Sequence, residues 1–280
     1  MGQETITYLT NIVISAILAG LMTHYWVTQG RAKAMGYWML SAWIMTLADV
    51  LFAARPDLPH WLARFAPTFL VTLGHAGLLL GAGVTARRER SWKLAVGLTL
   101  IHAVGLLYFL NMDQPSRWRM VFNGIIWAGL SFGSFWVLRQ APRMFWRPLV
   151  SPATVFLLHG LFHGLRIILA ILFAVRGWDD ASASLQIVGD LEVSFFMVAL
   201  FVGILITNLQ LRHEELTSAH AEVQTLSGLL PICSWCKKVR DDDGYWQQVE
   251  DYFATRSQIQ FTHGMCADCF QTQKDSHAKP

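Results

Sequence analysis

Residues 153–175 read ATVFLLHGLFHGLRIILAILFAV, a stretch in which Arg166 is the only residue with a permanent charge. An α-helix rises about 1.5 Å per residue, so about 20 apolar residues cross the hydrocarbon core of a bilayer, which is about 30 Å thick. A helix also satisfies its own backbone hydrogen bonds, as a segment in lipid must. The stretch is therefore predicted to span a membrane as a helix.

Six further stretches are apolar over about 17 to 25 residues, which is the length of a membrane-spanning helix. They are residues 6–26, 36–54, 65–86, 92–110, 120–138 and 185–209. The chain of 280 residues is 54% hydrophobic and only 15% charged, unlike an ordinary soluble domain. We therefore predict an all-α membrane protein with a seven-transmembrane-helix bundle over residues 1–209, surrounded by membrane lipids.

The loops between these stretches differ in basic residues, which are retained on the cytoplasmic side during insertion. The first, third and fifth loops, counted with Lys93 at the start of the stretch 92–110, carry nine Lys and Arg, and the other three carry five. The residues before Ile6 have none and do not resemble a cleavable signal peptide. The N-terminus is therefore predicted to be periplasmic and the C-terminus cytoplasmic. The net charge of +3 is explained by these loops, so no nucleic-acid partner is predicted.

Four cysteines, the only ones in the chain, form two pairs after the last apolar stretch. They are Cys233 and Cys236, and Cys266 and Cys269. Two CxxC pairs supply four thiolates, the ligand set of a structural zinc ion, and a reducing cytoplasm disfavours stable disulfides. The sequence therefore predicts a zinc module over residues 231–272, followed by a disordered tail over 273–280.

The 29 residues between the two pairs are long for a zinc ribbon and must form structure of their own. Gly244 after three aspartates indicates a turn, and Trp246, Val249 and Tyr252 recur with helical spacing. His263 is either a fifth candidate ligand, a hydrogen-bond donor to a thiolate, or a neighbour without a ligand role.

The segment LLPICSWCKKVRDDDGYWQQVEDYFATRSQIQFTHGMCADCF, residues 229–270, resembles a C-terminal module of bacterial signal-transduction proteins that follows PAS-like or receiver domains. Its LPICxxCKK, DDGYW and HGxCxxC motifs carry the resemblance. The resemblance implies that the four cysteines bind metal, with His263 accompanying them, and that the chain works in bacterial signalling at the inner membrane. The membrane part is similar to multi-helix sensory regions of bacteria at Tyr37-Trp38 and Arg87-Arg88.

Residues 210–230 connect the last apolar stretch to the cysteines with a heptad pattern. Leu209, Leu216, Val223 and Leu230 are seven apart, and Ala219 and Leu226 fall between them in three and four steps. This pattern favours a parallel two-stranded coiled-coil stalk, and hence a homodimer. The alternative is one amphipathic helix lying on its own protein.

Ionisable residues within the apolar stretches need partners, because an unpaired charge in lipid costs several kcal/mol. Four are charged in their usual form: Asp49, Arg166, Asp190 and Glu192. We place these four in the outer half of the bilayer and expect Arg166 to pair with Asp190 or Glu192. They form either a ligand-binding and coupling pocket or a structural ion pair between the sixth and seventh helices.

Four histidines form a second set of candidates nearer the bilayer centre: His75, His102, His159 and His163. His159 and His163 are four residues apart, so both lie on one helix face. Histidines at this depth ligate haem or copper, relay protons or hydrogen-bond between helices. Gly160 and Gly164 beside them permit close helix packing, which favours the last of these roles.

No phosphate-binding glycine loop, kinase segment, cyclase signature or serine elbow is present, so the sequence does not predict an enzyme. The prediction is a bacterial inner-membrane sensor or signal transducer that couples a stimulus to a cytoplasmic zinc interaction module and, through it, to a cytoplasmic signalling protein. The alternative is a membrane redox protein with haem or copper on the histidines. A transporter is a third reading, although no inverted repeat is evident.

Overall fold

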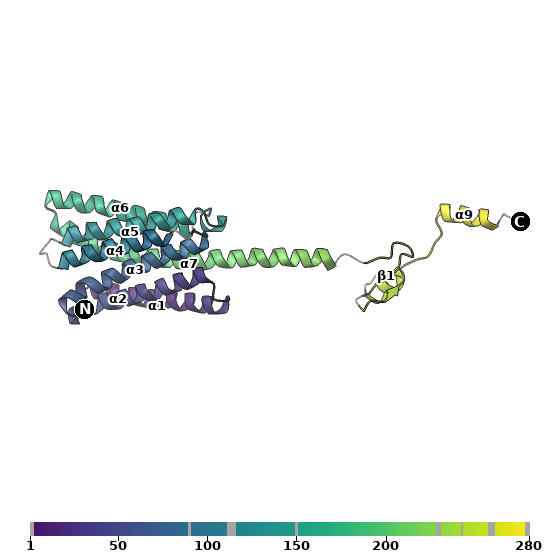
Figure 1. The fold of residues 1–280 in the computed structure, drawn as a ribbon, viewed down its shortest axis with the longest axis horizontal. Helices are drawn as coiled ribbons and strands as arrows, with labels where there is room; N and C mark the ends of the chain where they lie inside the picture. The colour runs from purple at the N-terminus through teal and green to yellow at the C-terminus, as the bar shows by residue number, and fades with distance from the viewer. Residues whose placement is uncertain are drawn as a thin grey trace. The chain divides into compact units, whose positions relative to one another are not determined.

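The computed structural model describes residues 3–88, 91–110, 116–148, 151–227, 231–241, 243–256 and 261–277 (Figure 1). The chain divides into two compact units, Met1–His213 and Glu214–Pro280. Seven helices in the described residues are long and apolar enough to cross a membrane, as the sequence predicts. The protein is therefore a multi-pass, helical membrane protein.

The bundle helices are α1 (Gln3–Thr28), α2 (Lys33–Ala53), α3 (His60–Thr85), α4 (Ser91–Leu110), α5 (Ser116–Leu138), α6 (Pro152–Arg176) and α7 (Asp179–Ser227). Two short 3-10 helices, η1 (Arg55–Asp57) and η2 (Arg143–Phe145), lie between them. Figure 1 shows the bundle helices running side by side. Helix α7 continues past the predicted apolar stretch, and its residues from Glu214 belong to the second unit.

The ends of α6 show how local sequence sets a helix boundary. The Ser151 hydroxyl accepts a hydrogen bond from the Thr154 N–H at 3.3 Å, and Pro152 occupies the first helical position. At the other end Gly177 adopts a left-handed conformation with φ 70°, and Trp178 N–H donates to the Phe173 carbonyl at 3.0 Å. Helix α6 is thus fixed at both ends of the segment that carries His159, His163 and Arg166.

Close approach between α2 and α3 depends on three glycines of α3. A Cβ added at Gly74, Gly77 or Gly81 would overlap a side chain of α2, namely Met45, Ser41 or Trp38 respectively. Small residues of this kind let membrane helices pack by van der Waals contact where the hydrophobic effect is absent. These three glycines therefore determine how near α2 lies to α3.

The bundle core has two apolar clusters. One includes Trp38, Phe156 and Phe201 and draws on every bundle helix except α4; the other joins α3, α4 and α5 around Leu79 and Leu130, with Ala48 of α2. Large apolar side chains also cover the outside, as on α4, where only Ala95, His102 and Leu106 are buried. An apolar exterior around a packed core is what a lipid-facing bundle requires.

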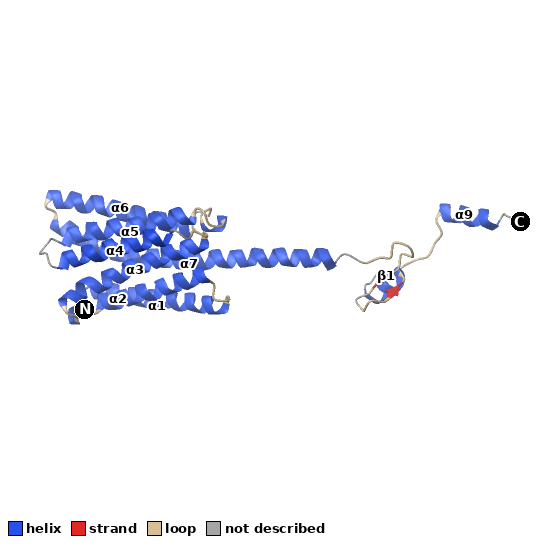
Figure 2. Ribbon diagram, in the orientation of Figure 1, coloured by secondary structure: helices blue, strands red, loops and turns tan. Residues whose placement is uncertain are grey.

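The second unit contains the only described strands, β1 (Val239–Arg240) and β2 (Trp246–Gln247), drawn in red in Figure 2, and the short helices α8 (Val249–Arg256) and α9 (Ala267–His277). The strands pair antiparallel, with Val239 opposite Gln247. The turn expected at Gly244 is confirmed: its φ is 91° and its N–H donates to the Asp241 carbonyl at 3.1 Å.

Two details of the second unit differ from the sequence predictions. Trp246 lies on β2 rather than on a helix face, because the turn at Gly244 returns the chain beside β1. Within the predicted disordered tail, residues 273–277 are helical in α9, where no Gly or Pro interrupts the helix and the Thr272 hydroxyl donates to the Asp268 carbonyl at 2.8 Å. Residues 278–280 lie outside the described residues.

Candidate functional site

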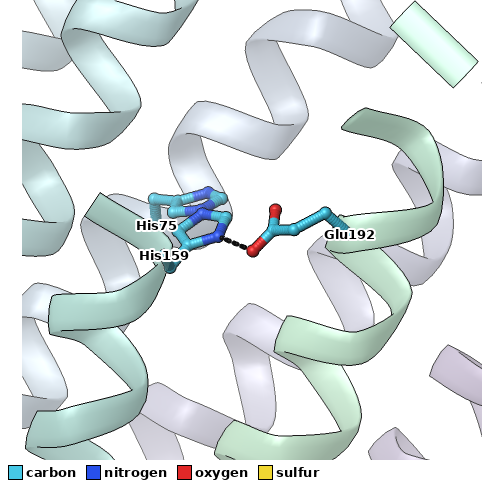
Figure 3. A network of polar contacts seen from close by, with 3 residues as sticks. All are labelled: His75, His159 and Glu192. Carbon is cyan, nitrogen blue, oxygen red and sulfur yellow. Dashed lines mark hydrogen bonds and ion pairs between the residues drawn. The ribbon is translucent and has the colours of Figure 1, made fainter. Parts of the chain in front are cut away.

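A row of polar side chains joins three helices inside the bundle: His75 on α3, His159 on α6 and Glu192 on α7 (Figure 3). His159 Nδ1 lies 2.8 Å from Glu192 Oε1, and His159 Nε2 lies 3.0 Å from His75 Nε2. His75 Nδ1 lies 2.8 Å from the carbonyl oxygen of Val71. The row therefore runs unbroken from the backbone of α3 to the carboxylate on α7.

The Val71 carbonyl determines the direction of the hydrogen bonds in this row. A carbonyl oxygen only accepts, so His75 Nδ1 donates to Val71, and Nε2 of the neutral His75 ring is an acceptor. His159 Nε2 must then donate to His75, which assigns the tautomer of the second ring. His159 Nδ1 is left facing the Glu192 carboxylate, where the two groups can share one proton or bind one cation.

His163 lies one turn further along α6, with its ring centroid 4.5 Å from that of His159. It is 0% exposed, and within the described chain neither of its ring nitrogens has a hydrogen-bond partner. Glu192 Oε2 is likewise buried without a partner there. A buried polar atom without a partner costs about 1 to 3 kcal/mol, so these atoms mark a site whose bonding is incomplete.

One ligating atom from each of His159, His163 and Glu192 lies within 4.8 Å of the other two. In the described residues, no other set of three or more His, Cys, Asp or Glu meets this criterion. Two imidazoles and a carboxylate are a ligand set used by divalent transition metals. The arrangement can therefore hold a small cation as well as a shared proton.

Arg166 lies on the same face of α6, seven residues after His159, and is only 5% exposed. Asp190 and Glu192 are both within electrostatic range of its guanidinium group. Gly189 makes room for that group, because a Cβ there would lie 2.5 Å from Arg166 Cζ. The structure thus brings together three of the four charged residues that the sequence grouped, although Glu192 hydrogen-bonds to His159.

Helix α1 holds the carboxylates at the edge of this network. The Ser15 hydroxyl donates to Asp49 Oδ2 at 3.0 Å, and the Tyr8 hydroxyl donates to Asp190 Oδ2 at 3.3 Å. Asp49 is within electrostatic range of Asp190. Asp49 therefore joins the same network from α2, as part of one cluster of charged groups.

His102 belongs to a separate hydrogen-bonded set. Its Nδ1 lies 2.6 Å from the Thr72 hydroxyl, and its Nε2 lies 3.0 Å from Asn123 Oδ1. The indole N–H of Trp127 donates to the same Thr72 hydroxyl at 2.9 Å. Both ring nitrogens of His102 are thus used in holding α3, α4 and α5 together, so this ring has no nitrogen left for a metal.

Aromatic rings enclose the three remaining histidines. Phe196 stacks on His159 at 3.7 Å between centroids and on His75 at 5.5 Å, and Trp127 meets His163 edge-on at 5.4 Å. A porphyrin needs an open slot between its axial ligands, and these rings fill the space beside the histidines.

The first cysteine pair lies on a tight loop. Cys233 N–H donates to the Lys238 carbonyl at 2.8 Å, Lys237 N–H donates to the Cys233 carbonyl at 3.0 Å, and Lys237 has a positive φ of 60°. Hydrogen bonds from the backbone at Cys236, and then Trp235, lower the pKa of the Cys233 thiol. This favours the thiolate, the form that binds metal.

The second pair begins α9. Phe270 N–H donates to the Cys266 carbonyl at 2.9 Å, and backbone and thiol hydrogen bonds at Cys269 lower the pKa of Cys266. All four cysteines are free of disulfides, and His263 is exposed. The structure forms each pair locally but does not gather three or more of the four sulfurs within 4.8 Å of one another.

The link between Glu192 and His159 was missed from the sequence, which placed the carboxylates and histidines in two sets at different depths. A signal was available: His159, His163 and Arg166 follow the spacing i, i+4, i+7, so they share one face of α6. Glu192 and the histidines belong to one network because α7 packs against that face.

Comparison with known proteins gave no match to a protein-family model, a curated protein or a solved structure.

Proposed function

We propose that the protein is a bacterial inner-membrane sensor or signal transducer, with its N-terminus in the periplasm and its C-terminus in the cytoplasm. The observation that carries the proposal is helix α7, one helix from Asp179 to Ser227 that holds Glu192 of the buried network and continues into the polar segment before the cysteines. A change at Glu192 therefore acts on the helix whose sequence continues toward the cysteine pairs. No catalytic group is assigned.

A half-open pocket lies beside α7 at the end of the bundle. A cavity of about 200 Å³ is lined by Trp26, Trp38, Asn208 and Arg212 among others, so α7 borders free space where its predicted stalk begins. In the proposed mechanism the stimulus shifts α6 against α7 near Arg166, and the stalk changes spacing or register. A zinc module at its end passes the change to a cytoplasmic signalling protein.

Dimerisation through the stalk is part of the proposal. Leu209 and Leu216, one heptad apart on α7, are 55% and 70% exposed in the single chain. A second copy would cover them as coiled-coil seam residues. Leu230 lies outside the described residues, as do the side chains of Val223 and Leu226.

The zinc module predicts one zinc ion per chain that depends on the cysteines, measured in the purified full-length protein by elemental analysis after loosely bound metal is removed. Replacing Cys233 and Cys266 by serine is expected to remove it, because two thiolates do not complete a tetrahedral site. The zinc content of the His263→Ala variant is measured for comparison, and it tests whether His263 is a ligand. Full zinc content in the double cysteine variant would refute the module.

The sensor mechanism predicts that changes in the buried network alter the distance between two stalks. A spin label on a non-natural amino acid at Ser218, which is exposed, reports this distance by pulsed electron resonance and leaves the cysteines intact. Arg166→Ala and Glu192→Gln are expected to shift the distance distribution, whereas His102→Gln, outside the network, is not. Identical distributions in all four proteins would refute the coupling, and the lack of any distance between copies would refute the dimer.

A redox protein is the second candidate, because three buried histidines lie together. A strong visible absorption band from haem in the purified protein would support it over the sensor.

A further inference from the structure

We propose that His159, His163 and Glu192 form a binding site for a divalent first-row transition metal ion inside the membrane bundle. The suggestion that this ion is the stimulus rests on the proposed sensor function. The existence of the site does not depend on that function. The three residues come from α6 and α7, the two helices whose relative position the sensor mechanism changes.

The first argument is the incomplete bonding of His163 and Glu192. A single proton shared between His159 Nδ1 and Glu192 Oε1 satisfies those two atoms, which lie 2.8 Å apart. Within the described residues, it leaves both nitrogens of His163 and the second carboxylate oxygen buried without partners. One metal ion at the centre of the three side chains bonds to one nitrogen of His163 and to the Glu192 carboxylate, so it partners atoms that the shared proton does not reach.

The second argument is that His159 already has the hydrogen bond that a metal-binding histidine requires. Ligating histidines donate their other ring N–H to an acceptor, which fixes the tautomer and the ring orientation. His159 Nε2 donates to His75 Nε2 at 3.0 Å, and His75 is anchored in turn to the Val71 carbonyl. Nδ1 of His159, which faces Glu192, is therefore left as the ligand atom.

The third argument concerns size. Metal–nitrogen bonds of about 2.0 Å place neighbouring ligands of a tetrahedral ion about 3.3 Å apart. The three ligating atoms here lie within 4.8 Å of one another, so reaching that geometry brings neighbouring ligands closer by about 1.5 Å or less. The stacked Phe196 and the edge of Trp127 exclude a larger group.

The fourth argument is charge. The network holds three carboxyl groups, at Asp49, Asp190 and Glu192, and one guanidinium group, at Arg166. In its fully ionised form it lacks two positive charges, and net charge is strongly disfavoured inside a membrane. A divalent cation supplies both charges. Imidazole and carboxylate together suit zinc and copper better than the oxygen-preferring magnesium or calcium.

The test uses the full-length chain with Cys233, Cys236, Cys266 and Cys269 replaced by serine, so that thiolates do not bind the probe. The purified protein is titrated with Cu²⁺ alone. We expect about one tightly bound copper per chain, with nitrogen hyperfine coupling from imidazole in its electron resonance spectrum. His163→Gln and Glu192→Gln are each expected to weaken binding by more than about tenfold, since even outer-shell changes cost that much.

His102→Gln is the matched control, because His102 is equally buried in the bundle but already bonded at both nitrogens, and it should keep the copper. Circular dichroism and size exclusion identify variants that fail to fold. The nitrogen hyperfine coupling of copper bound to the protein with His159, His163 and Glu192 intact tests the proposal independently of those variants. Absence of tight copper, or the same copper spectrum in His163→Gln, would overturn the site and leave a shared proton or buried water.

Metal binding and signalling can then be separated. Copper bound at this site with stalk distances that do not respond supports the site and contradicts the sensor mechanism. Stalk distances that respond to Arg166→Ala in a chain that binds no copper support the sensor and contradict the site.

Discussion

The Glu192→Ala protein will unfold at a markedly lower concentration of denaturing detergent than the unchanged protein, with a loss of unfolding free energy of about 3 kcal/mol or more. Glu192 faces the His159 ring at 2.8 Å and lies within electrostatic range of Arg166, both of them buried. Removing one partner of a buried charged pair leaves the other desolvated, and this costs more than the pair itself contributes. The alanine also leaves a gap between α6 and α7.

The control for this prediction is Glu214→Ala on the same helix. Glu214 is exposed, so its loss should change the unfolding free energy by less than about 0.5 kcal/mol. Both proteins are compared in the same micelles by far-ultraviolet circular dichroism along a titration with sodium dodecyl sulfate. If Glu192→Ala lowered the unfolding free energy as little as Glu214→Ala is expected to, Glu192 would have no structural role in the bundle. Glu192→Gln separates the two causes, because it fills the gap but removes the charge.

The membrane helices could be predicted because each depends on a local property of the chain. An apolar stretch of about 20 residues has one stable backbone form in lipid, whatever its neighbours are. All seven predicted stretches coincide with helices in the structure. The turn at Gly244 is local in the same sense, since the left-handed backbone and the preceding Asp241 determine it.

The candidate site could be predicted only in its parts. His159 and Glu192 are 33 residues apart, and His75 and His159 are 84 apart. Their contact depends on how α3, α6 and α7 are rotated about their own axes, which an apolar pattern on all sides does not reveal. Residue counting alone placed the carboxylates and the histidines at different depths, and the contact joins them.

The histidine tautomers and the buried polar atoms without partners could not be predicted from the sequence either. The importance of His163 comes from what does not contact its nitrogens in the described chain, and His102 differs from it through Thr72 and Asn123. In the sequence both are isolated histidines in apolar surroundings. Only tertiary contacts distinguish a histidine that holds helices together from one that has nitrogens available for a ligand.

The glycines of α3 likewise show a pattern in the sequence whose packing partner only the structure identifies. The spacing of Gly74, Gly77 and Gly81 is visible in the sequence and indicates a face for close helix packing. The partner of that face is not visible there. In the structure it is α2, and Gly81 meets the indole of Trp38, which is 1% exposed and donates to the Leu78 carbonyl at 3.3 Å.

Gly81→Ala is therefore expected to lower the unfolding free energy by about 1 to 3 kcal/mol, the usual range for overfilling a packed core. The added Cβ would overlap the Trp38 indole, and this ring is held against Phe145 and by its own hydrogen bond. Turning the ring toward the neighbouring cavity would break its hydrogen bond to Leu78 and its contact with Phe145, so either that loss or a movement of α2 away from α3 lowers the stability. Thermal unfolding in detergent, followed by circular dichroism, measures the effect.

Gly97→Ala on α4 is the matched control, because it makes the same chemical change in a membrane helix where a Cβ meets nothing within 4 Å. Without a collision, alanine restricts the unfolded backbone more than glycine and raises stability by up to about 1 kcal/mol. The two substitutions should thus shift the unfolding midpoint in opposite directions. The penalty at Gly81 should also shrink in a Trp38→Phe background, where the smaller ring leaves room. If Gly81→Ala were as harmless as Gly97→Ala, the close packing of α2 on α3 would be wrong.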